Sequence, residues 1–292
     1  MKPDQLSKTA SFIAIKFYGL TRIPTFQSLF DDSVVNFYDR VVQSLPSPLN
    51  YYHYWLKHHW IRQLYIWSEE LLLPGDLLHI IARKFYIRQF VNELMDDGYE
   101  QVIVLGAGFD DLALTYSQKG FSCFELEVPH MAKLKQQFIH RYYPDSKHPE
   151  IISAHLTESQ QKLPFGSNSN IQRDKKTILI AEGFFDYLHT DLVGTILNQM
   201  QDYFLDNPAL ITTHFALNEL PVHHRWSFKT GVKAVGEELK LHQDINEFRK
   251  LLTKNDYVIE KQLDHRTMAL RLQQKIGTDL PMLQGFYLLM NK

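Results

Sequence analysis

The pattern of apolar and polar positions changes near residue 98. Residues 33–45 and 51–73 carry apolar side chains at the three- and four-residue spacing of helices that pack on one side. Prolines at 46 and 48 separate these two helices. Pro74-Gly75 ends the second, and Asp76 is the predicted N-cap of a third helix that ends at Gly98. The first 98 residues are therefore predicted to be helical.

Beyond residue 98, short apolar runs rich in β-branched residues alternate with helical patterns. The predicted strands cover residues 102–105, 121–127, 150–156, 177–181, 209–216, 257–263 and 285–291. The predicted helices are one capped by Asp110 or Asp111 and ending near Gly120, then 131–142, 191–205, and 244–254 with Asp244 as cap. Such alternation is typical of a parallel, doubly wound sheet.

The last two predicted strands have no helical pattern of crossover length between them, so one of them is expected to run antiparallel. The predicted fold class is therefore α/β. It consists of a Rossmann-like, seven-stranded sheet, mostly parallel with one antiparallel strand, in a domain at 99–292. Residues 1–98 are predicted to form an N-terminal helical cap.

Composition and charge narrow the function without naming it. The 292 residues are 45% hydrophobic and 22% charged, as in a soluble globular protein, and the net charge of −2 offers no general attraction to nucleic acid. The chain contains no run of about 18 uncharged apolar residues, so no membrane span is expected. The apolar run at 12–15 is cut by Lys16, so no signal peptide is expected and a cytoplasmic location is the default.

Several kinds of catalytic site are not supported. The single cysteine, Cys123, excludes a disulfide framework and a cysteine-rich metal site. The pairs His58-His59 and His223-His224 point about 100° apart on a helix, and no H-E-x-x-H motif occurs, so no metal site is expected. The chain also contains neither the G-x-S-x-G motif of serine hydrolases nor a P-loop.

The first predicted strand runs directly into Gly106-x-Gly108 and a helix. This turn is the nucleotide-binding turn of Rossmann-like sheets, although a tight turn with no ligand would use the same glycines. Glu127 lies 21 residues after Gly106, where a carboxylate accepts both ribose hydroxyls. Asp111 occupies the third glycine position of the dinucleotide motif, and with Asp110 it would repel a pyrophosphate. A cationic, phosphate-free adenosyl ligand fits better, and S-adenosylmethionine is such a ligand.

Four sequence blocks together resemble the leucine carboxyl methyltransferase family. They are Ala82-Arg83-Lys84 through Phe90, Gln101-Val-Ile-Val-Leu-Gly-Ala-Gly-Phe-Asp110, Phe124-Glu-Leu-Glu-Val-Pro129 with Lys133 and Lys135 behind it, and Ala181-Glu-Gly-Phe-Phe-Asp-Tyr-Leu188. This family is a branch of the class I S-adenosylmethionine-dependent methyltransferases. It includes protein phosphatase methyltransferases and bacterial O-methyltransferases of polyketide pathways.

The resemblance implies a cofactor site. Arg83 would pair with the methionine carboxylate of the cofactor, and Glu182 would lie near its amine. Gly106 and Gly108 would lie beneath it, and Glu127 replaces the family's aspartate at the ribose. His155-Leu156 stands where the family often has Asp-Leu beside the adenine.

The chain also departs from the family pattern. Asp111-Leu112 replaces a common Thr-Arg pair, and Arg88 replaces an acid that is common in bacterial members. The resemblance further implies that the N-terminal helices fold over the active site. Some of the aromatic residues between 51 and 67 are therefore expected to line a substrate cleft.

The activity expected from this resemblance is O-methyl transfer, with a carboxylate of a small molecule or peptide ahead of a hydroxyl. A carboxylate is ionised at pH 7 and needs only a clamp, for which Arg225, His214 and Tyr187 are candidates. A hydroxyl would need a base, and His214 is the best placed. Two alternatives stay open: a nicotinamide-dependent oxidoreductase, and a non-catalytic protein that binds an adenosyl ligand.

Overall fold

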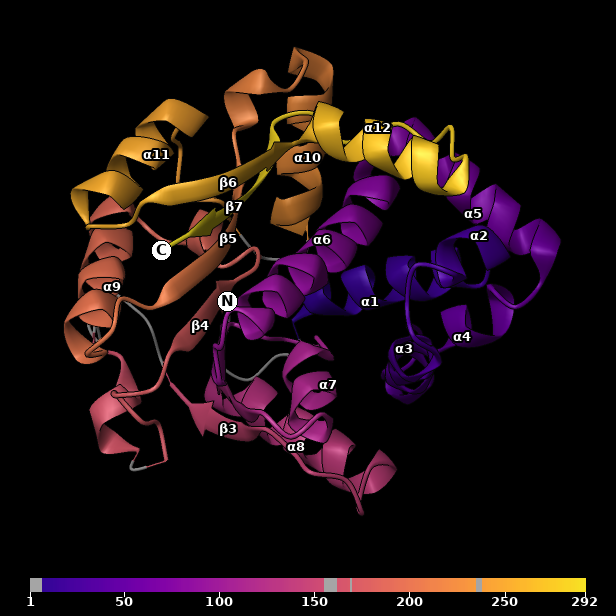
Figure 1. The fold of residues 1–292 in the computed structure, drawn as a ribbon. Helices are drawn as coiled ribbons and strands as arrows, with labels where there is room; N and C mark the ends of the chain where they lie inside the picture. Colours follow the sequence, from indigo (N-terminus) through magenta and orange to yellow (C-terminus); the bar gives the residue numbers. More distant parts are fainter. Residues whose placement is uncertain (1–6, 155–161, 169, 235–237) are drawn as a thin grey trace.

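A seven-stranded sheet with helices on both faces forms the centre of the protein (Figure 1). The computed structural model describes residues 7–154, 162–168, 170–234 and 238–292. The strand order is β3-β2-β1-β4-β5-β7-β6. The strands are β1 (Gln101–Leu105), β2 (Ser122–Glu127), β3 (Glu150–Ser153), β4 (Thr177–Ala181), β5 (Ala209–Phe215), β6 (Ile259–Asp264) and β7 (Phe286–Asn291).

The pairing confirms the predicted sheet. The pairs β1–β2, β1–β4, β2–β3 and β4–β5 are parallel, whereas β7 runs antiparallel to both β5 and β6. The carboxyl ends of β1, β2, β4 and β5 therefore lie along one edge, where open α/β sheets bind ligands.

A helix lies between the last two strands, contrary to the prediction that none of crossover length would be found there. This helix, α12 (His265–Ile276), is capped by Asp264 and buries only Met268 and Leu272. So narrow an apolar stripe produces little helical periodicity. The sequence analysis also missed α10 (Val222–Ala234), which is rich in polar residues.

The N-terminal region is helical, as predicted. Its helices are α1 (Lys8–Thr21), α2 (Pro24–Gln27), α3 (Asp32–Ser44), α4 (Tyr51–Trp55), α5 (His59–Leu72) and α6 (Asp76–Asp96). The single helix predicted over 51–73 is divided into α4 and α5, with buried Leu56 at the break. Asp76 is the first residue of α6 and not its cap, because left-handed Gly75 holds that position and the Asp76 carboxylate pairs with Lys16.

Helix α6 joins the helical region to the sheet. It contacts β5 and β7 on one side and α1, α5 and α12 on others. One continuous core includes Phe17 of α1, Phe37 of α3, Leu78 of α6 and Val102 of β1. The division into two domains near residue 98 therefore stays a prediction, since the two parts share their apolar interior.

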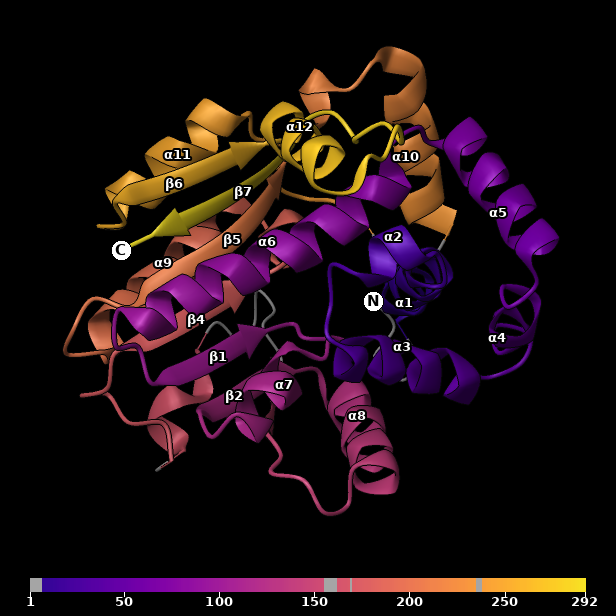
Figure 2. The same ribbon diagram turned by 45° about the vertical axis from the view of Figure 1, so that its right-hand side comes forward.

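The remaining helices cover the two faces of the sheet (Figure 2). Helices α7 (Leu112–Gln118) and α8 (Pro129–Tyr142) contribute to the same core as α6. Helices α9 (Thr190–Tyr203) and α11 (Ile245–Lys254) pack in a second core on the opposite face. Asp244 caps α11 through a capping box with Glu247, which confirms its predicted role. Short 3₁₀ turns are η1 (Pro164–Ser167), η2 (Phe185–Tyr187) and η3 (Leu217–Glu219).

Among the described residues, no helix is both long enough and apolar enough to span a membrane.

Gly75 provides a test of the junction between α5 and α6. Its φ is +89°, and a Cβ there would lie 2.3 Å from the backbone nitrogen of Leu283. Gly98 has nearly the same φ, +87°, but no atom within 4 Å of a Cβ. Gly98→Ala should therefore cost about 1–2 kcal/mol from backbone strain alone. Gly75→Ala should cost about 1–3 kcal/mol more, since the backbone must also move.

Urea unfolding of the two variants and the wild type measures both costs. Equal destabilisation by the two substitutions would show that the contact between Gly75 and Leu283 does not constrain the chain.

Candidate cofactor-binding site

The glycine loop after β1 has the predicted strand–turn–helix form. Gly106 and Gly108 have φ of +63° and +48°, and the Gly106 N–H donates to the Leu126 carbonyl at 2.8 Å. A Cβ on Gly106 would lie 2.7 Å from the ring of Phe184, and one on Gly108 would lie 3.1 Å from the Cβ of Ala10. The loop is thus covered by the segment before η2 and by the start of α1, so a side chain at either glycine position would meet one of these segments.

Glu127 ends β2 beside this loop, as expected. Its side chain is buried, and its two carboxylate oxygens accept hydrogen bonds from the backbone N–H groups of Gly108 at 2.6 Å and Val128 at 2.8 Å. Burial raises the pKa of Glu127, and these two donors oppose the rise. Each oxygen retains a further lone pair with which to accept a hydroxyl.

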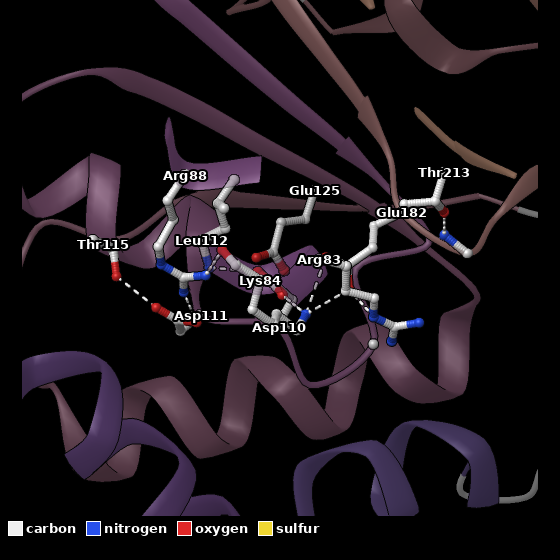
Figure 3. A network of polar contacts seen from close by, with 12 residues as sticks. Arg83, Lys84, Arg88, Asp110, Asp111, Leu112, Thr115, Glu125, Glu182 and Thr213 are labelled. Atoms are coloured by element: carbon white, nitrogen blue, oxygen red, sulfur yellow. Dashed lines mark hydrogen bonds and ion pairs between the residues drawn. The ribbon is translucent and has the colours of Figure 1, made fainter. Parts of the chain in front are cut away.

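Arg83 and Glu182 meet across the carboxyl edge of the sheet (Figure 3). Arg83 extends from α6, and Glu182 directly follows β4. Arg83 Nε lies 2.7 Å from Glu182 Oε1, and both side chains are about 10% exposed. The two opposite charges therefore neutralise each other inside the site. The Gly183 N–H donates to Thr213 Oγ1 at 2.7 Å and holds the backbone after Glu182.

Lys84 connects this pair to the glycine loop. Its Nζ lies 3.0 Å from Glu182 Oε1 and forms a buried ion pair with Asp110. Asp110 also accepts a hydrogen bond from the Leu112 N–H at 2.6 Å, so it satisfies the first turn of α7. The surrounding cations Lys84, Arg88 and Lys135 hold the pKa of the Asp110 carboxyl below its usual range, despite burial.

A second buried pair supports the loop from below. Lys135 and Glu125 are fully buried with their charged atoms 2.7 Å apart, and Lys135 Nζ also donates to the Asp110 carbonyl at 2.6 Å. Burial raises the pKa of Glu125 to about 7. The sequence blocks contained both residues, but no role was assigned to them. A charged residue inside an otherwise apolar strand is the feature that could have drawn attention to Glu125.

The two departures from the family pattern contact each other. Arg88 forms an ion pair with Asp111, whose other oxygen accepts from Thr115 Oγ1 at 2.8 Å. The Arg88 guanidinium also donates to the Lys84 carbonyl at 2.9 Å. Asp111 thus faces Arg88, and the negative charge of one departure is neutralised by the positive charge of the other.

The residues expected to handle the methyl acceptor belong to three different elements that follow β4 in the chain. Tyr187 ends η2, and Arg225 in α10 donates to the carbonyls of Asn218 and Leu220 at 2.8 and 3.1 Å. His214 is fully buried on the face covered by α11, where its ring stacks on Phe248 at 4.3 Å.

The two ring nitrogens of His214 also have neighbours inside the protein. Nε2 lies 3.1 Å from the Gln243 carbonyl, and Nδ1 lies 3.3 Å from Asp186. His155 and Leu156, the predicted adenine contacts, lie outside the described residues.

Comparisons with known proteins agree on the kind of protein. The family model described as leucine carboxyl methyltransferase matches residues 38–201, more than half of the chain. No curated protein matches the chain by sequence.

Solved structures of similar fold include a protein named as a methyltransferase from Thermobifida fusca. It is 13% identical with a TM-score of 0.56, and the match covers 80% of this chain and 88% of that one. A DUF574 family protein from Streptomyces avermitilis is 11% identical with a TM-score of 0.55, over 80% and 90% of the two chains. At these identities the two structures show the fold alone.

The pairing of Arg88 with Asp111 is testable by a double-mutant cycle. Either single change to alanine leaves a buried charge without its partner and should cost about 3–5 kcal/mol. The double variant should cost less than the sum, with a coupling of about 1–3 kcal/mol. The half-exposed pair Lys175–Glu100, 3.4 Å apart, is the control and should couple by less than about 1 kcal/mol. Coupling in the buried pair no larger than in this control would contradict the compensation.

Proposed function

Because the chain belongs to the leucine carboxyl methyltransferase family, we propose that it methylates a carboxylate oxygen of a small molecule or peptide. The chain is an S-adenosylmethionine-dependent methyltransferase by its family.

The observation that carries the cofactor part of the proposal is the buried pair of Arg83 and Glu182. Arg83 Nε and Glu182 Oε1 lie 2.7 Å apart and enclosed at the carboxyl edge of the sheet. The methionyl end of the cofactor carries a carboxylate and an ammonium, the two charges that an arginine and a glutamate bind. The residues present therefore fit this group.

The other cofactor contacts follow from the same edge. Glu127 would accept the ribose hydroxyls, and the backbone of Gly106 and Gly108 would lie beneath the cofactor. We retain His155 and Leu156 as the proposed adenine contacts.

An anionic acceptor is supported by the charge of α10. This helix follows β5 after η3, and it contains Arg225, Lys229 and Lys233 with no acidic residue between positions 222 and 234. Lys229 and Lys233 are exposed to solvent. A surface of one charge near a site concentrates substrates of the opposite charge.

We assign the acceptor-handling residues as follows. Arg225 would clamp the acceptor carboxylate, since the carbonyls of Asn218 and Leu220 already hold its guanidinium. Tyr187 would donate a hydrogen bond to it. His214 would act as a positioning residue through Asp186, because its ring is enclosed and Asp186 belongs to the same turn as Tyr187.

The cofactor supplies a methyl group activated on a sulfonium. The chain must hold the acceptor oxygen in line with that methyl group and exclude water. An ionised carboxylate is already a nucleophile at pH 7, so no residue has to remove a proton. Phe184 and the start of α1, which cover the glycine loop, would shield the site from solvent.

Removing either charge of the Arg83–Glu182 pair should weaken the cofactor. Arg83→Ala and Glu182→Gln each lose a charged hydrogen bond in a buried site, about 1.5–3 kcal/mol or ten- to a hundred-fold in affinity. Calorimetric titration with S-adenosylmethionine and with its demethylated product measures this loss. The exposed residues Arg141 and Glu100 provide matched controls, Arg141→Ala and Glu100→Gln, which should bind as the wild type does. Unchanged affinity in both site variants would remove the pair from the cofactor site.

The acceptor class is tested with cofactor labelled on its methyl group. A panel of aromatic and peptide carboxylic acids is compared with phenols and alcohols of matched skeleton. We expect label in the acids, released as volatile methanol by mild base, because esters hydrolyse there and ethers do not. Lys229→Ala with Lys233→Ala should raise KM for the acids several-fold and leave cofactor affinity unchanged. Label that enters the phenols and resists base would contradict the carboxylate proposal while leaving methyl transfer intact.

A further inference from the structure

Helix α5 exposes a stripe of large apolar side chains. Trp60, Leu64, Trp67 and Leu71 are 84%, 63%, 63% and 68% exposed. Their spacing of four, three and four residues places them within one narrow arc of the helix, at 100° per residue. This is the spacing of a seam between two packed helices.

The inward side of α5 combines apolar and charged contacts, because Tyr65 and Ile66 pack on the core. Arg62 is buried and donates to the Leu56 carbonyl at 3.0 Å, and Glu69 pairs with Lys16 at 2.7 Å. The helix is therefore held to the protein by apolar and charged contacts, while its tryptophans face solvent. Among the described residues nothing covers the stripe, so it offers an apolar side to a partner.

The aromatic residues of α4 extend this surface. Tyr51, Tyr54 and Trp55 are about half exposed or more, and the rings of Tyr52 and Tyr65 meet at 5.8 Å to join the two helices. Figures 1 and 2 both show α4 and α5 at the outer side of the molecule.

The exposed apolar area is a substantial part of what a stable interface needs. With about 200 Å² per aromatic side chain, the rings of Trp60 and Trp67 leave roughly 300 Å² in solvent. Ile61, Leu64, Leu71 and Leu72 add further area. The sum supplies a substantial part of the roughly 800 Å² that each partner buries in a standard protein interface.

We propose that this surface binds a second copy of the chain, with the two α5 helices antiparallel. A twofold axis midway between Leu64 and Trp67 places Trp60 opposite Leu71 of the second copy, and Leu64 opposite Trp67. Each indole then packs on a leucine. In a twofold dimer the same surface of both copies forms the interface, and this is the usual arrangement of identical chains.

The flanks of the seam are compatible with this pairing. They bring Ile61 beside Ser68 of the second copy, and Gln63 beside Glu70, so no like charges meet. The stripe itself carries no charged side chain, and thus no cation with which to hold an anionic lipid headgroup or a nucleic acid.

The first experiment measures the mass of the full chain in solution by light scattering. We expect twice 34.4 kDa for the wild type. Trp60→Ser combined with Trp67→Ser should give the mass of one chain with unchanged circular dichroism, because both residues face solvent. Leu205→Ser, at an equally exposed apolar residue elsewhere, should stay dimeric.

The second experiment tests the antiparallel register by oxidation. Ile61→Cys with Ser68→Cys should form a disulfide-linked dimer, whereas either single variant should not, because its two cysteines would lie too far apart. The native Cys123 is buried and does not interfere. A wild type with the mass of one chain would overturn the proposal. So would binding to phosphatidylcholine vesicles that the tryptophan substitutions abolish, since a membrane would then cover the stripe.

Discussion

Buried charges at the carboxyl edge of the sheet constrain the rest of this structure. Helix α6 brings Arg83, Lys84 and Arg88 along one side to the edge, and the acids Glu182, Asp110 and Asp111 meet them from the ends of β4 and β1. An unpaired charge in such a place costs several kcal/mol, so each cation requires its acid. The helix, the glycine loop and the end of β4 are therefore held in one relative position.

This constraint explains why α6 belongs to the site although it precedes the sheet in the chain. Its apolar residues pack on β5, β7 and the N-terminal helices, while its cations face the site. A cofactor that brings its own carboxylate and ammonium would enter an arrangement already balanced in charge. The same balance accommodates the two departures from the family pattern, because Arg88 and Asp111 neutralise each other.

The side chains at the sheet edge and those on helices α4 and α5 differ in whether the chain itself provides their contacts. At the sheet edge, polar groups are buried and paired within the chain. On α4 and α5, apolar groups remain in solvent. The first pattern is that of a preorganised site for a charged small molecule, and the second is the basis of the proposed contact between two copies of the chain.

The sequence by itself determined the alternation of strands and helices, the glycine turn, and the positions of Glu127 and Glu182 at strand ends, whereas Arg83 was indicated only by the family resemblance. These features depend on local periodicity and on strand ends, which neighbouring residues specify. Only the tertiary structure decided that Arg88 pairs with Asp111, that Lys84 bridges Asp110 and Glu182, and that α5 is turned outward. Such contacts join residues that are far apart in the chain. The spacing and composition of the sequence do not indicate which distant residue neutralises a buried charge or covers an apolar face. Helix α12 was not predicted for a related reason. Its stability comes from packing on α6 and β6, and its sequence has only a weak helical periodicity.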